Sequence, residues 1–494
     1  MTAVTDRQWN SVSERGAARG APRPLIVDLD QTLVRTDTLH ESIVDLTFRF
    51  PAQLLAGLCA VRHGRAALKR RIASIAALDC RALPYDPAVL DLIADRRAQG
   101  GEVHLVTGAD QEIADNVART LDVFDSATGS AGRQNLTART KAAHLSERFP
   151  DGFDYVGDSA ADLPVWRAAG HAIIAGSSRS VAVRTRRSGL ETSVLPRTKP
   201  SLRQWVKALR LHQWSKNLLV FVPLVLSHEY RVPGLVALVA AAWLLFGLTA
   251  SATYLINDLC DLAADRSHPT KRFRALAAGL IPISTAVPLA VALLAIGLAG
   301  AFALHPGFGL TVAAYVTLTL LYSFKLKNQP MIDVAAIAAL FALRITAGMV
   351  ILAHPLSLWL VTFTAVLFLS LALAKRTTEL VQACRNLRPV KGRGYLPGDE
   401  VLTLALGIAS GIVSVVVMVL YMSIEAMPTG LYANRAPLML IPAILGLWLM
   451  RIWLLAHRGT LNDDPVFYAL RDRVSWLHAV AVCALWAVAV SGAW

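Results

Sequence analysis

The spacing of apolar residues changes near residue 200 and divides the chain into two halves. Before that point, short apolar runs such as PLIVDLD, EVHLVTG and FDYVGD are separated by longer polar segments. Short apolar runs that end in polar residues are typical of buried strands, and strands that alternate with helices predict a doubly wound parallel sheet. From about residue 217, the apolar stretches are long enough to cross a membrane as helices. The pattern predicts an α/β domain followed by an all-α membrane domain.

The same pattern gives the expected domain boundaries. We predict a disordered tail at 1–23, the α/β domain at 24–182, a basic linker at 183–204 and a polytopic membrane domain at 205–494. Residues 38–95 are moderately apolar and are predicted to form a helical cap on the first domain. Nine apolar spans are expected in the membrane domain, at 213–230, 235–256, 284–304, 308–324, 331–353, 356–374, 401–424, 436–456 and 474–493.

The basic residues of the membrane half are distributed unequally between its loops. With the first domain in the cytoplasm, the outer loops contain only Arg231 and Arg435. The inner loops contain Arg266, Lys271, Arg272, Arg274, Lys325, Lys327, Lys375, Arg376, Arg385, Arg388, Lys391, Arg393, Arg451, Arg458, Arg471 and Arg473. This asymmetry predicts a multi-pass protein of the cell (inner) membrane with a cytoplasmic N-terminal domain.

The net charge of +14 needs no nucleic acid to explain it, because loop orientation and anionic lipid account for it. The five cysteines have no metal-site spacing, which fits a reducing compartment.

Polar residues whose side chains suit phosphoryl chemistry follow the predicted strands of the first domain. They are Asp28, Asp30, Thr107, Lys141, Asp158 and Asp162. Ligands of doubly wound sheets bind at the carboxyl ends of strands, so we expect these side chains to meet there. Asp28 can attack phosphorus as a nucleophile, and Asp30 can protonate the leaving alcohol. Thr107 and Lys141 can hold phosphoryl oxygens, and the candidate Mg²⁺ ligands are Asp28, Asp30, Asp158 and Asp162.

The order DxDxT, hhhT, Lys and GDxxxD resembles the haloacid dehalogenase superfamily over about residues 24–180. The resemblance implies a phosphatase, because the second aspartate, Asp30, is typical of the phosphatases of that superfamily. It also implies that residues 38–95 are the cap. The alternative is a degenerate domain that is retained only as a folded module.

A second cluster of acids ends a long apolar run, in NDLCDLAADR at 257–266. On one continuous helix, Asp258, Asp261 and Asp265 would share a face, where three like charges would require a cation. Aspartate oxygens suit Mg²⁺, whose coordination is often completed by substrate phosphates. Lys271 and Arg274 follow closely and can hold phosphate oxygens. The segment therefore predicts a diphosphate-binding face.

NDxxDxxxDR with its basic run resembles the UbiA superfamily of intramembrane prenyltransferases over about residues 200–494. The usual second acidic pair is missing, because YSFKLKNQPMIDV holds the single acid Asp333. This segment is similar instead to the decaprenyl-phosphate phosphoribosyltransferase branch, as are LRLHQWSKNLLVFVPL, FALRITAG and LALAKRTTEL. Ala275 departs from the proline that is usual in the branch. The implied substrate-binding residues are Lys216, Asn257, Arg266, Lys271, Arg274, Tyr322, Lys325, Lys327, Asp333, Arg344, Lys375 and Arg376.

The two resemblances together imply a bifunctional, Mg²⁺-dependent enzyme. Its membrane half would transfer 5-phosphoribose from phosphoribosyl diphosphate to a polyprenyl phosphate, and its soluble half would remove the 5-phosphate. The alternatives are prenyl transfer from a prenyl diphosphate to an aromatic acceptor, and a phosphatase with a silent membrane anchor. An alternative interpretation of Arg344 is a structural arginine that snorkels to the membrane surface. An alternative interpretation of Lys375 and Arg376 is that they anchor the end of their helix at the membrane interface. The sequence leaves homo-oligomer formation open.

Overall fold

The computed structural model describes residues 22–59, 62, 65–76, 78–131, 135–176, 179–385, 394–461 and 465–491. Almost all of the tail expected at 1–23, and the loop residues Arg388, Lys391 and Arg393, lie outside these ranges. The chain forms two compact units. The first contains Met1–Ala208 and Asp258–Ala286, and the second contains Leu209–Asn257 and Val287–Trp494. The segment that carries the second acidic cluster therefore groups with the α/β domain.

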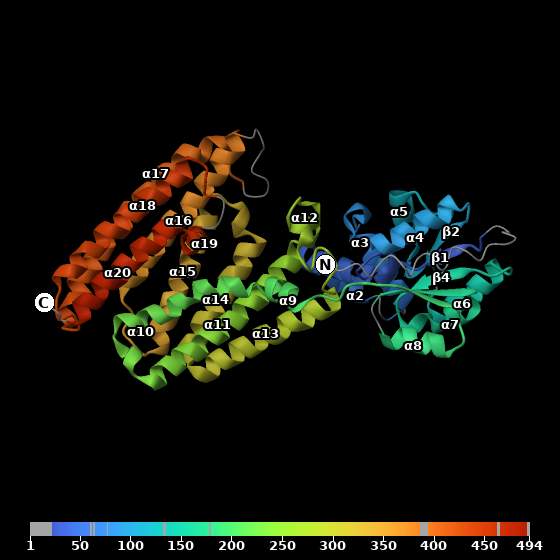
Figure 1. Ribbon diagram of the computed structural model, residues 1–494, viewed down its shortest axis with the longest axis horizontal. Coiled ribbons are helices and arrows are strands. Elements are labelled where there is room, and N and C mark those ends of the chain that lie inside the picture. The colour runs from blue at the N-terminus through green and yellow to red at the C-terminus, as the bar shows by residue number, and fades with distance from the viewer. Residues whose placement is uncertain are drawn as a thin grey trace, which may run out of the picture. The chain divides into compact units, whose positions relative to one another are not determined.

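The first unit is built on a six-stranded parallel sheet with the strand order β3-β2-β1-β4-β5-β6 (Figure 1). The strands are β1 (Leu25–Val27), β2 (Val103–Asp110), β3 (Ser126–Ser130), β4 (Asp154–Gly157), β5 (His171–Ala175) and β6 (Thr192–Leu195). This arrangement confirms the doubly wound sheet that the sequence predicts. The strand order reverses beside β1, which is where such sheets bind ligands.

Helices cover both faces of this sheet (Figure 1). Helices α4 (Pro87–Ala98) and α5 (Gln111–Leu121) cover one face, and α6 (Ala138–Arg148), α7 (Leu163–Ala168) and α8 (Arg179–Arg187) cover the other. In β1, Leu25 and Val27 belong to the first core and Ile26 to the second. Both faces of the strand are buried, which explains why its sequence is an uninterrupted apolar run.

The segment expected as the cap is helical but is not uniform in its packing. Helices α1 (Thr38–Arg49), α2 (Pro51–Leu58) and α3 (Arg65–Ala76) come first, and Leu46, Ile72 and Ala76 form a small core of their own. Helix α4 instead packs Val89 and Ile93 against the sheet. The sheet also continues into the segment expected as the linker, since β6 pairs with β5 there. Helix α9 (Leu202–Ala208) ends the first part of the unit.

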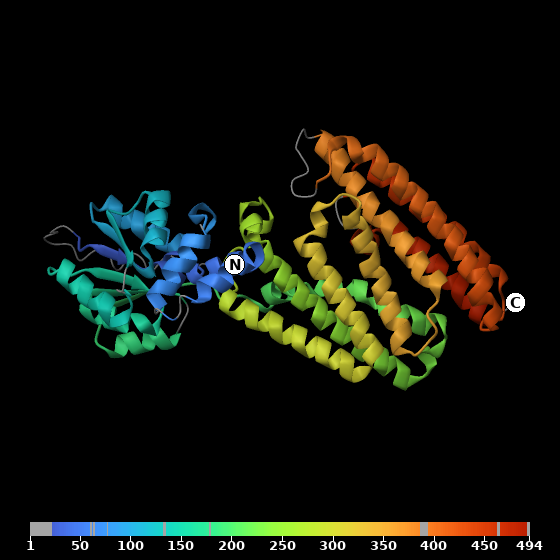
Figure 2. The same ribbon diagram turned by 180° about the vertical axis from the view of Figure 1, so that it is seen from behind.

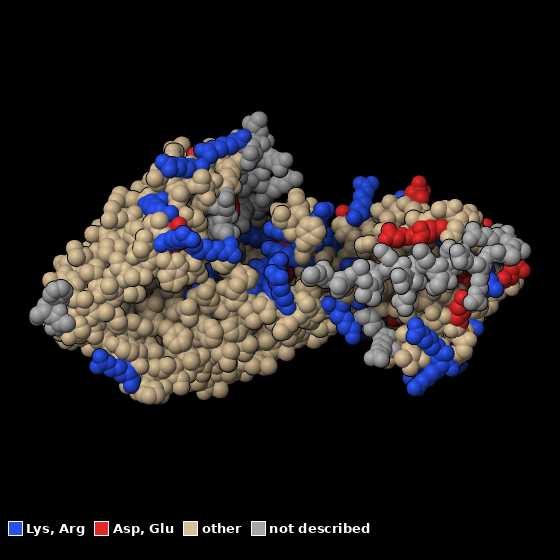
Figure 3. Space-filling model, in the orientation of Figure 1, with Lys and Arg blue, Asp and Glu red and all other residues tan. Residues whose placement is uncertain are grey.

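The described residues contain eight helices long and apolar enough to cross a membrane. The main α-helices are α11 (Pro233–Cys260), α13 (Ile283–Leu304), α14 (Pro306–Phe324), α15 (Ile332–Ile351), α16 (Leu358–Arg385), α17 (Glu400–Tyr421), α18 (Ile441–His457) and α20 (Arg473–Ser491), with α12 (Leu262–Ser267) and α19 (Pro465–Arg471) as short helices. The first expected span, 213–230, forms the 3₁₀-helix η5 (Leu211–Phe221) and the short helix α10 (Val222–Leu226). Helices α17, α18 and α20 lie side by side in both views (Figures 1 and 2), and the visible face of this unit is largely uncharged (Figure 3).

Small residues allow α17 to approach α16 and α18 closely. The Ser370 hydroxyl of α16 donates to the Gly407 carbonyl at 2.8 Å, and Trp453 Nε1 of α18 donates to Ser370 Oγ at 3.0 Å. A Cβ atom on Gly407 would overlap the Trp453 ring. Close approach through glycine and serine is a common way for helices to pack in a membrane, where apolar surface alone gives little drive to associate.

We expect Gly407→Leu to lower the thermal stability of the protein, because the new side chain overlaps Trp453 and parts three helices. Overpacking of this kind costs about 1–3 kcal/mol. Gly446→Leu on α18 is the matched control, since nothing lies within 4 Å of its Cβ position. Thermal unfolding of both variants in detergent measures the effect, and equal melting temperatures would contradict the packing argument.

Candidate functional site

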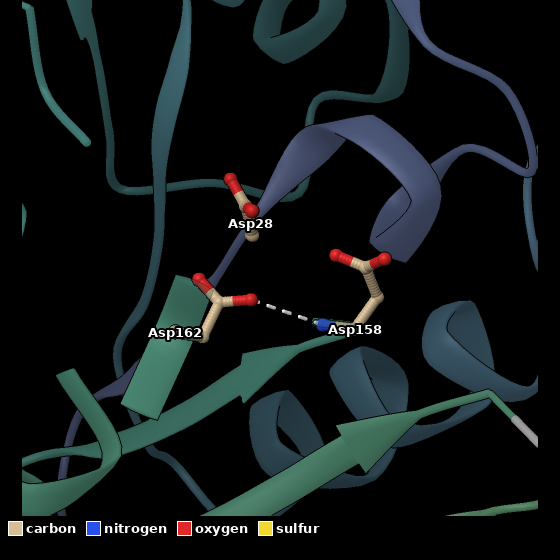
Figure 4. Close-up of side chains that lie close together, drawn as sticks. All are labelled: Asp28, Asp158 and Asp162. Carbon is tan, nitrogen blue, oxygen red and sulfur yellow. Dashed lines mark hydrogen bonds between the residues drawn. The ribbon is translucent and has the colours of Figure 1, made fainter. Parts of the chain in front are cut away.

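Three aspartates of the first unit converge where the strand order reverses. Asp28 directly follows β1, Asp158 directly follows the neighbouring strand β4, and Asp162 lies at the start of α7. One carboxylate oxygen from each lies within 4.8 Å of the others (Figure 4). Among the described residues this is the one group of three or more acids that is close enough to share a metal ion. The sequence predicted these three residues as ligands.

A lysine and a tyrosine connect the members of this trio. Lys141 Nζ donates to Asp28 Oδ1 and lies the same distance, 2.9 Å, from the Tyr155 hydroxyl. The Tyr155 hydroxyl lies 3.0 Å from Asp162 Oδ1, to which it donates. Lys141 is buried, so its charge is balanced locally by Asp28. The sequence predicted Lys141 but missed Tyr155, which looks like an ordinary core residue of β4.

Burial and mutual repulsion disturb the acids of the trio. Burial, followed by the charges of Asp162 and Asp28, raises the pKa of Asp158 to about 8. Burial and the Asp28 charge also raise the pKa of Asp162. The raised pKa values show that the three carboxylates repel one another when they are charged. Together they form an all-oxygen donor set of the kind that Mg²⁺ prefers. The residues present therefore fit the expected ion.

Asp30 lies apart from the trio, although the sequence placed it among the metal ligands. Its Oδ1 accepts a hydrogen bond of 2.7 Å from the Thr38 backbone N–H at the start of α1. Burial and the Asp37 charge raise the pKa of Asp30 to about 7. A carboxyl group that keeps its proton near neutral pH can protonate a leaving oxygen, which suits the acid role expected for Asp30. Thr107 is fully buried in β2, and its Oγ1 accepts from the Ala109 N–H at 3.0 Å.

Arg197 holds the loop that follows Asp28, and sequence reasoning missed it. It comes from the segment expected to be a linker, and its guanidinium donates to the carbonyls of Gln31 and Thr32 at 2.8 and 3.1 Å. Its Nε also donates to Asp86 at 2.7 Å. Gln31 has a φ of 57°, a left-handed conformation that is unfavourable for this residue type. Arg197 therefore holds a strained turn in place beside the candidate nucleophile.

We expect Arg197→Ala to reduce hydrolysis of small phosphate esters about tenfold, because the two hydrogen bonds that fix the turn after Asp28 and the bond to Asp86 are lost. Arg197→Lys keeps the charge but not the fork of donors, so it should recover only part of the activity. Arg187→Ala, at an exposed position of α8, is the control. Phosphate release at saturating substrate measures the effect, and wild-type kcat in Arg197→Ala would exclude this positioning role.

The second acidic cluster lies on two helices instead of the one expected. Helix α11 ends at Cys260, Asp261 has non-helical dihedrals (φ −92°, ψ 9°), and α12 begins at Leu262. The expectation of a continuous helix is wrong, because the backbone leaves helical geometry at Asp261, and aspartate is an unfavourable residue for a helix interior. Asp258 and Asp265 are nevertheless brought together by Arg274, whose Nη1 lies 3.2 and 2.6 Å from their carboxylates. Lys271 Nζ lies 3.9 Å from Asp265.

Arg266, expected among the substrate-binding residues, pairs with an acid of the α/β domain. Its guanidinium makes two hydrogen bonds to the Glu41 carboxylate on α1, at 2.6 and 3.0 Å, and its Nε donates to the Ala277 carbonyl at 3.0 Å. Both charged side chains are buried. This pair lies within the first unit and ties the segment around α12 to the α/β domain.

In the second unit, Asp333 and Arg376 pair with each other. Arg376 Nε lies 2.8 Å from Asp333 Oδ2, and both side chains are almost fully buried. Tyr395, which sequence reasoning missed, donates its hydroxyl proton to Asp333 Oδ1 at 2.6 Å, and Glu379 also contacts Arg376. The acid that stands alone in its sequence motif is thus fully engaged within the protein. Removing either partner would leave a buried charge.

The remaining predicted residues lie on several elements of the second unit. Asn257 is near the end of α11, Tyr322 is in α14, Lys325 follows α14, Lys327 is in η8 (Leu326–Asn328) and Lys375 precedes Arg376 in α16. Lys216 is in η5 and Arg344 is in α15, where it contacts Asn217 of η5.

The membrane half of the chain matches a known protein family. The UbiA prenyltransferase family matches residues 218–477. The uncharacterized protein y4nM of Sinorhizobium fredii is 45% identical over 469 residues, which cover 94% of this chain and 91% of that protein. The decaprenyl-phosphate phosphoribosyltransferase of Mycobacterium tuberculosis is 40% identical over 185 residues, 37% of this chain and 61% of that protein. The structure of a UbiA homolog from Archaeoglobus fulgidus bound to GPP and Mg²⁺ has a TM-score of 0.44 and 18% identity, over 57% of this chain and 99% of that one.

Proposed function

Since the chain belongs to the UbiA prenyltransferase family, we propose that its membrane domain transfers 5-phosphoribose from phosphoribosyl diphosphate to a polyprenyl phosphate. The observation that carries the proposal is the similarity of this chain to a decaprenyl-phosphate phosphoribosyltransferase. In addition, Asp333, the single acid of its loop motif, is already paired with Arg376. With Asp333 engaged and the basic residues Lys325 and Lys327 nearby in sequence, this loop suits a second phosphate better than a second metal ion.

In this proposal, Asp258, Asp261 and Asp265 would hold Mg²⁺ together with the diphosphate, although their carboxylates do not form a metal-ligating group by themselves among the described residues. The ion would neutralise charge on the leaving diphosphate. Arg274 already contacts two of these acids and would also hold diphosphate oxygens. The bond between ribose C1 and the diphosphate oxygen breaks, and an oxygen of the polyprenyl phosphate bonds to C1. The negative charge that grows on the leaving group is stabilised by the basic side chains around it.

For the α/β domain, we propose that it removes the 5-phosphate of the lipid-linked product. Asp28 attacks phosphorus, and Asp30 gives its proton to the departing ribose oxygen; Asp30 then takes a proton from the water that cleaves the aspartyl-phosphate. Lys141 is held beside Asp28 and stabilises the phosphoryl oxygens. Asp28, Asp158 and Asp162 would hold the Mg²⁺ of this site. A tethered phosphatase would meet a high effective concentration of the product.

The proposed location is the cell (inner) membrane, with the α/β domain in the cytoplasm. The Glu41–Arg266 pair supports the same side for the α/β domain and the loop after α11. In intact cells, we expect a cysteine at Arg435 to react with an impermeant thiol reagent and one at Arg393 to remain unlabelled. The reverse labelling would overturn the topology and the side on which substrates enter.

The proposed transfer is tested with purified protein, Mg²⁺, a polyprenyl phosphate and phosphoribosyl diphosphate labelled in the ribose. We expect label in the organic extract that depends on the polyprenyl phosphate. The rival reaction is tested in parallel with a labelled prenyl diphosphate and an aromatic acceptor. Label that appears only in the second reaction would overturn the proposed substrates and leave the family assignment intact.

A further inference from the structure

Arg344 is a buried cation that no carboxylate balances in the described part of the chain. It lies in the middle of α15 and is 4% exposed. Its Nε donates to Asn217 Oδ1 at 2.9 Å, its Nη1 to the Leu340 carbonyl at 2.5 Å, and its Nη2 to the Tyr315 hydroxyl at 3.3 Å. All three acceptors are neutral. A membrane-embedded arginine usually has a counter-charge or faces a cavity.

Aromatic rings stabilise this guanidinium only in part. Its Cζ lies 4.9 Å from the ring centroid of Tyr315, 5.1 Å from that of Phe341 and 5.6 Å from that of Phe246. The faces of these rings attract a cation, but each contact is weaker than a full counter-charge. The rings also hold the guanidinium in one place, so that it is positioned before any ligand arrives.

Asn217 gives an independent indication of a missing anion. The residue is 1% exposed, its Oδ1 is used by Arg344, and its Nδ2 has no hydrogen-bond partner. Buried amide donors are almost always paired, so an unpaired one requires an explanation. A buried donor with no acceptor, next to a buried cation with no counter-charge, is the arrangement expected of an anion site.

The surroundings of Arg344 favour an anion that enters from the proposed cytoplasmic end. A helical side chain points toward the helix N-terminus, and the bond to Leu340 lies one turn closer to that end of α15. Lys216, next to Asn217 in the chain, places its Nζ 5.7 Å from the Phe341 ring that Arg344 also faces. A second cation therefore lies near the same ring.

We propose that Arg344 and the Asn217 amide bind a phosphate monoester group inside the helix bundle. The inference rests on the proposed function, in which both substrates carry such a group, on the ribose 5-position or at the end of the polyprenyl chain. A guanidinium suits phosphate because its donors form a planar fork, and the amide adds one more donor. The site would hold the phosphate of that substrate in a fixed position before transfer.

Asn217→Asp tests this proposal, because it keeps the side-chain shape while it replaces the amide donor by a carboxylate beside Arg344. If the two residues are only structural, the new ion pair forms and the KM values of both substrates stay unchanged. If they bind phosphate, the carboxylate repels it, and we expect the KM of one substrate to rise about tenfold or more, as for one lost charge-assisted hydrogen bond. The substrate whose KM rises identifies the source of the phosphate.

Two further measurements keep the test decisive. Asn434→Asp, at a loop position whose Oδ1 accepts from the Ala436 N–H, is the control for the added charge. Stabilisation of the full-length protein by inorganic phosphate against heat needs no transfer activity, and Asn217→Asp should lose it while Asn434→Asp keeps it. If Asn217→Asp does not fold, Asn217→Ala and Arg344→Lys replace it. If Asn217→Asp leaves both the KM values and the stabilisation by phosphate unchanged, the proposed site is wrong. If the wild type shows no transfer activity but is stabilised by phosphate, and Asn217→Asp loses that stabilisation, the site stands and only the proposed reaction is refuted.

Discussion

Asp28→Asn is expected to reduce phosphate release by about a thousandfold or more, because the amide cannot attack phosphorus. The substitution keeps the side-chain shape but removes the charge that Lys141 contacts at 2.9 Å and one carboxylate of the trio. Phosphoribosyl transfer should continue, so lipid-linked ribose 5-phosphate should accumulate. The wild type should instead yield lipid-linked ribose and free phosphate. Chromatography of the lipid extract and a phosphate assay measure the two products.

Asp151→Asn, at an exposed position of the same domain, is the control for the charge change and should behave as the wild type. If the wild type and Asp28→Asn both give the phosphorylated lipid without phosphate release, the α/β domain acts on another substrate. Hydrolysis of a small phosphate ester separates that result from an inactive domain. Such hydrolysis by the wild type, absent in Asp28→Asn, would confirm the nucleophile even where the lipid is not its substrate.

Asp258→Asn and Asp265→Asn are each expected to reduce transfer by about a thousandfold, the loss typical of a removed metal ligand or transition-state contact. Both carboxylates are buried and both contact Arg274, so either change also alters the position of that guanidinium. Hydrolysis of small phosphate esters should persist, because the Asp28 trio does not change. Transfer of ribose label into lipid measures the effect.

A pair of neighbouring arginines provides the matched control. Arg274→Gln should raise the KM for phosphoribosyl diphosphate, whereas Arg272→Gln, at an exposed position of the same basic run, should leave it unchanged. Near-normal transfer in either aspartate variant would show that the metal assignment of the second acidic cluster is wrong.

The first unit connects its two candidate sites through a short stretch of α1. The N–H of Thr38 binds Asp30, and Glu41, one turn later, binds Arg266, which directly follows Asp265. Asp30 and the acidic segment that ends at Asp265 are therefore joined by covalent and hydrogen-bonded links inside one compact unit.

The sequence alone was sufficient for the properties that depend on residues close to one another in the chain. The apolar runs of β1, β2 and β4 predicted a parallel sheet, and parallel strands bring their carboxyl ends to one edge, so Asp28 and Asp158 could be expected to lie together. Long apolar stretches predicted the membrane helices, because length and hydropathy are read directly from the chain.

Only the tertiary structure decided how the charged residues are paired. Arg266 binds Glu41 across 225 residues of sequence, Arg376 binds Asp333 across 43, and Arg344 binds Asn217 across 127. Each pair depends on the packing of elements that are remote in the chain, and a motif that lists a residue as basic or acidic does not specify its partner. The break at Asp261 and the separation of Asp30 from the trio likewise follow from local backbone geometry within a packed unit. Ion pairs act over a few ångströms, so the distances set by packing determine which predicted residues are engaged by the protein and which can meet a ligand.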